Sequence, residues 1–221
     1  MKNMTITYEV GNALYINITN RCSNHCDFCI RNNGDGAYGS ESLWLSQEPS
    51  REEILSAVRS RRLSDYEELV FCGYGEPTER LEDMIWVARE LKKEFSVKIR
   101  VNTNGHSSLL LGRDTAPMYQ NAIDTVSISL NAPNAEEYDK MCHSKFGKAA
   151  YAGLLDFAKR VKQYVPHVVL TVVDSALTPE GIAACREIAK ETGVPLRVRH
   201  YIGKAESENV DSAVEKEQKT Q

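Results

Sequence analysis

The chain has 221 residues, of which 42% are hydrophobic, and this is enough apolar sequence for one sizeable core, so we expect a single domain over residues 1–202. Its formal net charge of -4 provides no general basic field, which argues against nucleic acid as a partner. The longest apolar run, PHVVLTVVD, is too short to cross a bilayer, and MKNMTITYEV lacks the apolar stretch of a signal peptide, so we expect no membrane partner and a cytoplasmic location.

Short apolar runs rich in β-branched residues recur along the chain. The first two, TITYEV and ALYINIT, flank the turn at Gly11 and Asn12 and indicate an N-terminal β-hairpin. Later runs are each short enough for a strand that is buried on both faces. These later runs are ELVFCGY, VKIRVNT, TVSISLN, HVVLTVVD and PLRVRHYI.

Helical patterns lie between most of these runs. SREEILSAVRS begins with a capping box, in which Ser50 precedes Glu53 by three residues. ERLEDMIWVARELKKEF and AAYAGLLDFAKRVKQYV each place apolar residues on one helical face, and LTPEGIAACREIAKETGV has Thr178 as N-cap, Pro179 in the first turn and Gly193 as its stop. Strands that alternate with helices imply right-handed parallel crossovers. About six βα units therefore predict an α/β fold with a parallel sheet, curved into a partial (β/α)6 TIM-like barrel.

Two segments depart from this alternation. RNNGDGAYGSES, which contains the glycine-rich residues 33–39, matches no P-loop or dinucleotide fingerprint. We interpret it as a mobile loop, with a lid over the site as the alternative. After SENVDS the sequence is polar and charged without apolar periodicity, which predicts a solvated tail over residues 203–221.

Three of the six cysteines, Cys22, Cys26 and Cys29, follow the second predicted strand directly. A reducing compartment and a core of this size argue against a disulfide framework, so metal binding or redox chemistry is the better interpretation. A structural zinc site takes four protein ligands, usually in two separated pairs, and the chain has no second CxxC pair; His25 is a cramped alternative ligand. A [4Fe-4S] cluster held by three cysteines keeps one iron corner open, as catalytic metal sites require.

The other cysteines, Cys72, Cys142 and Cys185, are isolated in the sequence and are interpreted as small buried apolar residues. Polar residues follow the end of every predicted parallel strand. Because the carboxyl ends of parallel strands meet on one rim, where reactive groups gather, these residues are site candidates. In chain order they are Arg21 with the three clustered cysteines, GYGEPT, NTNGH, SLNAP, Asp174 with Ser175, and Arg199, His200 and Tyr201.

The CxxxCxxC spacing of Cys22, Cys26 and Cys29, together with GYGEPT and six βα units, resembles the radical S-adenosylmethionine (SAM) superfamily from Ile16 to about Ile202. Within this superfamily the sequence resembles the TatD-associated radical SAM proteins, which are encoded near or linked to a TatD-type hydrolase. The resemblance implies a [4Fe-4S] cluster on the three cysteines and SAM chelated to its open iron through the methionine amino and carboxylate groups. It also implies a 5'-deoxyadenosyl radical that abstracts hydrogen from the substrate.

The resemblance also implies positions for SAM. Tyr74 stands where the family's strand-end motif has its first glycine, and SLN lacks the lysine that relatives place there. The residues implied to contact SAM are Gly75, Glu76 and Pro77 with the amino group, Asn102 and Thr103 with the methionine end, Ser129 and Asn131 with the ribose and carboxylate, His200 near the ribose, and Phe28, which precedes the last cysteine of the motif.

The rim residues that SAM does not use would face the substrate. They are Tyr74, His106, Asp174, Arg199 and Tyr201. Arg199 has the chemistry to pair with a carboxylate or phosphate, with a surface ion pair as the alternative. The resemblance implies a flavodoxin- or ferredoxin-type electron donor, and the chain lacks the cysteine-rich extension of members with auxiliary clusters, so we expect one cluster.

Three functions remain open at this point. The first is a radical SAM enzyme that acts on a small-molecule substrate, with a functional link to a TatD-type hydrolase. The second is an activating enzyme that installs a glycyl radical on a partner protein. The third is a zinc-binding structural module, which metal analysis would separate from the other two.

Overall fold

The computed structural model describes residues 4–200, and within them the chain forms one seven-stranded sheet in the order β1 to β7. The strands are β1 Thr7–Val10, β2 Ala13–Ile16, β3 Glu68–Phe71, β4 Ile99–Thr103, β5 Thr125–Ser129, β6 His167–Val173 and β7 Leu196–Arg199. Only β1 is antiparallel to its neighbour, and every later pair is parallel. The predicted hairpin is therefore confirmed, as is the α/β fold with six parallel strands.

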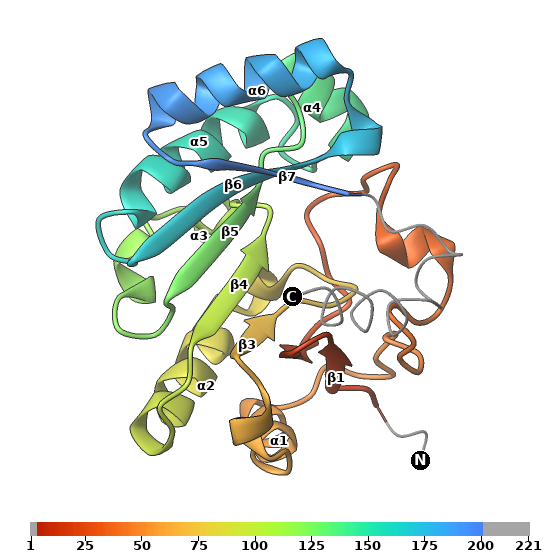
Figure 1. Ribbon diagram of the computed structural model, residues 1–221, viewed down its shortest axis with the longest axis vertical. Coiled ribbons are helices and arrows are strands. Elements are labelled where there is room, and N and C mark those ends of the chain that lie inside the picture. The colour runs from red at the N-terminus through yellow and green to blue at the C-terminus, as the bar shows by residue number, and fades with distance from the viewer. Residues whose placement is uncertain (1–3, 201–221) are drawn as a thin grey trace, which may run out of the picture.

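Helices connect the parallel strands and lie along the outer side of the curved sheet (Figure 1). Within residues 4–200 the α-helices are α1 Arg51–Arg59, α2 Leu81–Glu94, α3 Ser107–Leu111, α4 Ala135–Cys142, α5 Ala149–Val161 and α6 Pro179–Thr192. Short 3₁₀ turns are η1 Ile30–Asn33, η2 Leu63–Asp65, η3 Pro77–Arg80, η4 Ala116–Tyr119 and η5 Asp174–Ala176. A helix follows each strand from β2 to β6, which is the arrangement of a partial TIM-like barrel.

Local sequence signals set the helix ends as predicted. The Glu53 amide donates to the Ser50 hydroxyl at 3.1 Å and the Ser50 amide donates to the Glu53 carboxylate at 2.7 Å, which completes the capping box of α1. Thr178 caps α6 by accepting from the Gly181 amide, and Gly193 ends it in the left-handed region at φ 67°. The short helices α3 and α4 were not predicted from the sequence.

Alternation along the strands gives the sheet two different faces. On the outer face alternate residues pack against the helices in one apolar core; in β4, for example, Ile99 and Val101 are fully buried there. Arg100 and Asn102 of the same strand are half-buried on the inner face. The inner face is thus polar along much of its length, with Tyr15, Arg100, Asn102, Ser127, Ser129, Thr171, Arg197 and Arg199.

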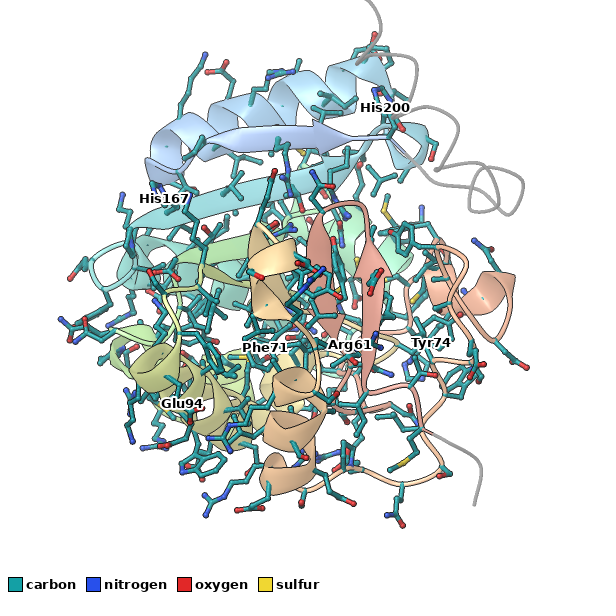
Figure 2. All side chains as sticks on the ribbon, turned by 60° about the horizontal axis from the view of Figure 1, so that its bottom comes forward. Arg61, Phe71, Tyr74, Glu94, His167 and His200 are labelled. Atoms are coloured by element: carbon teal, nitrogen blue, oxygen red, sulfur yellow. The ribbon has the colours of Figure 1, made fainter. Side chains whose placement is uncertain are left out.

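The parallel strands bring their carboxyl ends to one edge of the sheet. Figure 2 shows His167, at the start of β6, and His200, just after β7, at opposite ends of the strands. Strand β7 ends at Arg199, whereas the predicted run continued to Ile202, and Tyr201 and the predicted tail 203–221 lie outside the described residues. Within the described part of the chain, no helix is long and apolar enough to cross a membrane.

Candidate functional site

The three clustered cysteines lie on the loop that leaves β2 at the carboxyl edge of the sheet, and each is partly exposed. Burial raises the pKa of the Cys22 thiol to about 12 and raises the pKa of Cys29. The pKa of Cys26 is also raised, first by its hydrogen bond with Cys142 and then by burial. Without a metal these thiols therefore keep their protons at neutral pH, and a metal that binds them must displace those protons.

A single metal ion and an iron-sulfur cluster require different arrangements of thiols. Within residues 4–200, no three His, Cys, Asp or Glu side chains converge closely enough to hold a single metal ion. A closed zinc site needs four converging ligands, whereas cysteines that bind different corners of an iron-sulfur cluster stand further apart. Three thiols on one loop provide soft donors, which suit an iron-sulfur cluster or a zinc ion.

The cysteine loop is held against the end of α4. The His25 amide donates to the Cys142 carbonyl at 2.9 Å and the Asp27 amide donates to the Met141 carbonyl at 3.1 Å. The side-chain amide of Asn24 donates to the Tyr138 hydroxyl at 2.9 Å. The sequence gave no signal for these contacts, because they join segments more than a hundred residues apart. Cys142 is buried as predicted, yet it lies beside Cys26 instead of within an unrelated part of the core.

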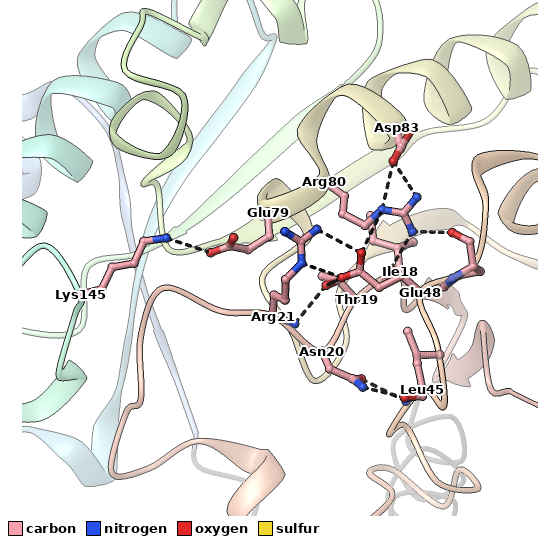
Figure 3. A network of polar contacts seen from close by, with 11 residues as sticks. Ile18, Thr19, Asn20, Arg21, Leu45, Glu48, Glu79, Arg80, Asp83 and Lys145 are labelled. Carbon is pink, nitrogen blue, oxygen red and sulfur yellow. Dashed lines mark hydrogen bonds and ion pairs between the residues drawn. The ribbon is translucent and has the colours of Figure 1, made fainter.

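An ion-pair network fixes the segment that leads into Cys22 (Figure 3). Arg21 donates to both carboxylate oxygens of Glu48, at 2.7 and 3.1 Å, and the Thr19 hydroxyl donates to the same carboxylate. Arg80, which is only 9% exposed, donates to the Ile18 carbonyl at 3.1 Å and to Asp83. Because these contacts immobilise the backbone directly before Cys22, they restrict where the first thiol can lie.

The GYGEP segment after β3 packs directly under this backbone. A Cβ atom on Gly75 would lie 2.3 Å from the Thr19 carbonyl oxygen and 2.6 Å from that of Arg21, so only glycine fits there. The Glu76 amide donates to the Arg21 carbonyl at 2.7 Å. Pro77 begins η3 directly after this contact. The backbone of Gly75 and Glu76 therefore packs tightly against the segment that leads into the cysteine loop.

The Glu76 side chain is buried and engaged within the protein. Its carboxylate accepts from the Thr103 hydroxyl at 2.7 Å, the Asn104 amide at 2.7 Å, and the Thr78 amide and hydroxyl at 3.1 and 2.8 Å. Burial raises the pKa of Glu76, although these hydrogen bonds oppose the rise. This carboxylate ties the end of β3 to the end of β4.

Asn102 and Thr103 present their side chains to opposite faces of β4. Thr103 is buried on the outer face with Glu76, whereas Asn102 is half-buried on the inner face, where its oxygen accepts from Arg100 at 3.2 Å. Of the two residues predicted at the methionine end, only Asn102 therefore directs its side chain to the inner face.

Three buried side-chain amide oxygens have no hydrogen-bond donor among the described residues: those of Asn17, Asn24 and Asn131. All three residues follow strand ends at the carboxyl edge, and Asn131 adopts a left-handed φ of 60°. A buried acceptor without a partner costs about 1–3 kcal/mol, so such atoms are expected where a ligand donates. Sequence reasoning identified Asn131 but missed Asn17 and Asn24.

His106 and Tyr74 differ from their predicted role of facing the substrate. His106 is fully buried between the Ser23 hydroxyl and the Tyr138 hydroxyl, each 3.3 Å from one ring nitrogen, and burial lowers its pKa to about 4. Tyr74 is 3% exposed, and its hydroxyl donates to the Gly34 carbonyl at 2.8 Å. Contacts from distant segments turn both rings inward, so neither side chain is exposed on the rim as the sequence led us to expect.

The glycine-rich loop is packed against the protein. Ala37 and Leu43 are buried with Tyr8 and Tyr74 in a second, smaller apolar cluster. The ring of Trp44 contacts that of Tyr74 edge-on, with centroids 5.1 Å apart. The loop therefore has its own buried anchor, which the interpretation as a mobile loop did not include.

The remaining predicted residues lie around the same edge. Phe28 is partly buried against the main core, and Ser129 is half-buried at the inner end of β5. Asp174 and His200 follow β6 and β7, and their side chains form an ion pair when the histidine is protonated. Arg199 is exposed on the inner face.

The sequence matches the family model described as "Radical SAM superfamily" over residues 16–207. "Molybdenum cofactor biosynthesis protein 1" of Drosophila melanogaster is 27% identical over 157 residues, which cover 69% of this chain and 26% of that protein. Streptococcus suis SuiB bound to precursor peptide SuiA has a TM-score of 0.60 at 16% identity, over 86% of this chain and 39% of that chain.

A radical SAM methyltransferase from Sphaerobacter thermophilus has a TM-score of 0.55 at 16% identity, over 88% of this chain and 68% of that chain. Likeness at this identity indicates a shared fold. The present chain spans about a quarter of the length of the Drosophila protein and well under half that of SuiB.

Proposed function

Because the chain belongs to the radical SAM superfamily and is an enzyme that uses a [4Fe-4S] cluster and SAM, we propose that Cys22, Cys26 and Cys29 bind the cluster and that the substrate is a small molecule. When bound, the two cofactors supply the reductive cleavage of SAM that yields a 5'-deoxyadenosyl radical, which abstracts hydrogen from the substrate. The observation that carries this proposal is the set of three partly exposed thiols on one anchored loop at the carboxyl edge of the sheet.

The residues proposed to hold SAM fall into those that accept hydrogen bonds from it and those that shape the backbone beside it. The unpaired oxygens of Asn24 and Asn131 accept hydrogen bonds, which suits the ammonium group and hydroxyls of SAM. Gly75 lets the backbone approach closely, and Pro77 begins the turn behind it. Glu76 and Thr103 do not contact SAM in this proposal; their hydrogen bond fixes the ends of β3 and β4 relative to each other. The other contacts in this proposal are Phe28, Asn102, Ser129 and His200.

The substrate side of the proposal uses Asp174 and Arg199, which lie at the ends of β6 and β7, and Tyr201, which lies outside the described residues. His106 keeps its neutral ring against the cysteine loop, so its role is positioning. The proposal includes a flavodoxin- or ferredoxin-type electron donor, membership of the TatD-associated group with a functional link to a TatD-type hydrolase, and a cytoplasmic location.

The test is electron paramagnetic resonance of the anaerobically reconstituted, dithionite-reduced protein with and without SAM. A cluster with an open iron changes its signal when SAM binds, and we expect that change in the wild type. Each of Cys22→Ala, Cys26→Ala and Cys29→Ala should lose the signal, whereas Cys185→Ala, in α6, should keep it. A signal that SAM does not alter, or one that survives all three substitutions, would contradict the assignment.

A further inference from the structure

Strand β7 carries two arginines on the inner face of the sheet. Leu196 and Val198 pack against the main apolar core, so the intervening Arg197 and Arg199 point to the other face. In the register with β6, Arg197 lies opposite Thr171, and Arg199 lies opposite Val173. Both arginines are exposed, and about 7 Å of strand separates their Cα atoms.

These two guanidinium groups have no anionic partner among residues 4–200. Within residues 4–200, no hydrogen bond or ion pair engages either of them, whereas Arg100 on the same face is paired with Glu68 at 2.7 Å. The pKa of Arg197 is lowered, first by partial burial and then by the positive charges of Arg100 and Arg199. The charge of Arg199 also acts on Cys72 and Tyr38, which lie on the facing side. Among the described residues, Arg100, Arg197 and Arg199 thus share this face, and Glu68 pairs with Arg100.

The register also relates this charge to the proposed SAM site. Ser129 of β5 pairs with Thr171 of β6, which pairs with Arg197, so the three residues form one row across the sheet. Neighbouring strands are about 4.8 Å apart, which places Arg197 about 10 Å from Ser129. A molecule of metabolite size spans that distance, with one end at the arginines and the other beside the cofactors.

From this placement, and resting on the proposed function, we infer that the substrate is a small molecule with an anionic group, a carboxylate or a phosphate, which Arg197 and Arg199 bind on the inner face of β7. Guanidinium groups bind both anions through paired, charge-assisted hydrogen bonds. Hydrogen is then abstracted from the part of the molecule that lies nearer to Ser129.

The experiment is a calorimetric titration of the reconstituted full chain at low ionic strength. Inorganic phosphate is the ligand in one titration and succinate in another, and the heat of binding is measured in each. Low salt is needed because the charges are exposed and are screened at higher ionic strength. We expect saturable binding of at least one anion, weakened about tenfold or more in Arg197→Gln/Arg199→Gln, as the loss of charge-assisted hydrogen bonds predicts. The stronger binder of the two identifies the class of anion.

Arg113→Gln is the matched control, because Arg113 is also exposed but pairs with Glu82 away from the inner face. It should bind the anions as the wild type does. No saturable binding in the wild type, or equal binding in the double variant, would overturn the inference. SAM cleavage by the wild type is measured separately, so a protein that cleaves SAM but fails the titration refutes only the anionic substrate.

Discussion

Lowering the pH is expected to destabilise the fold through His106. Its ring is fully buried between Ser23 and Tyr138, and burial lowers its pKa from 6.5 to about 4. A histidine whose pKa is depressed by folding takes up its proton more readily in the unfolded chain. Its contribution to stability is therefore complete above pH 6.5 and is lost as the pH falls towards 4.

The magnitude follows from the two pKa values. At about pH 5 most unfolded chains carry the proton on this residue and few folded ones do, which lowers the free energy of unfolding by about 2 kcal/mol relative to about pH 7.5. The loss approaches about 3 kcal/mol near pH 4. Either value is a substantial part of the stability of a single domain.

The assay is urea unfolding of the reduced protein without cofactors across this pH range, for the wild type and for His106→Gln. The glutamine side chain can still donate and accept hydrogen bonds but cannot titrate. The unfolding free energy of the variant should therefore fall by about 2 kcal/mol less than that of the wild type between about pH 7.5 and 5. His167→Gln, at the exposed start of β6, controls for loss of an imidazole. Identical pH dependence in the wild type and His106→Gln would refute this reasoning.

Three further substitutions test the packing of the site. Gly75→Ala should lower the unfolding free energy by about 1–3 kcal/mol and impair cluster incorporation, because the new Cβ would lie 2.3 Å from a backbone oxygen. Denaturation and iron analysis measure these two effects. Gly181→Ala is the control, since its new Cβ would lie no closer than 3.6 Å to any neighbouring atom. Arg80→Met should cost about 1.5–3 kcal/mol in the same denaturation assay, whereas the exposed Arg113→Met should not. Asn131→Gly, which keeps the left-handed backbone, should weaken SAM binding about tenfold in equilibrium dialysis.

Each of these expectations has a contrary result. A Gly75→Ala protein that is as stable as Gly181→Ala and takes up iron normally would show that the cysteine loop does not rest on this glycine. If Arg80→Met and Arg113→Met lowered the unfolding free energy equally, the network around Glu48 would not be what stabilises the cysteine loop. Unchanged SAM affinity in Asn131→Gly would mean that its unpaired oxygen has no part in binding.

Features encoded by neighbouring residues were predictable from the sequence. The capping box of Ser50 and Glu53, the Thr178 cap and the Gly193 stop depend on groups within a few residues of each other, and all three were confirmed. The order of the strands and of the longer helices was likewise readable from hydrophobic periodicity, which is why the α/β fold was predicted correctly.

Features that depend on distant contacts were not predictable in this way. Tyr74 and His106 follow strand ends, where exposed site residues are expected, but the loop at Gly34 and the Tyr138 ring of α4 bury them. The proximity of Cys142 to Cys26 has the same origin. Alternation along β7 indicates that Arg197 shares a face with Arg199, but only residues at the end of the strand were predicted as site residues.

Chromatography for 5'-deoxyadenosine and methionine, after anaerobic reconstitution with iron and sulfide and reduction by dithionite in the presence of SAM, tests the central claim most directly. We predict that the wild type and Cys185→Ala form both products and that the triple substitution of Cys22, Cys26 and Cys29 by alanine forms neither. Product formation by the triple variant, or a wild-type protein that binds zinc and no iron and leaves SAM intact, would contradict the account.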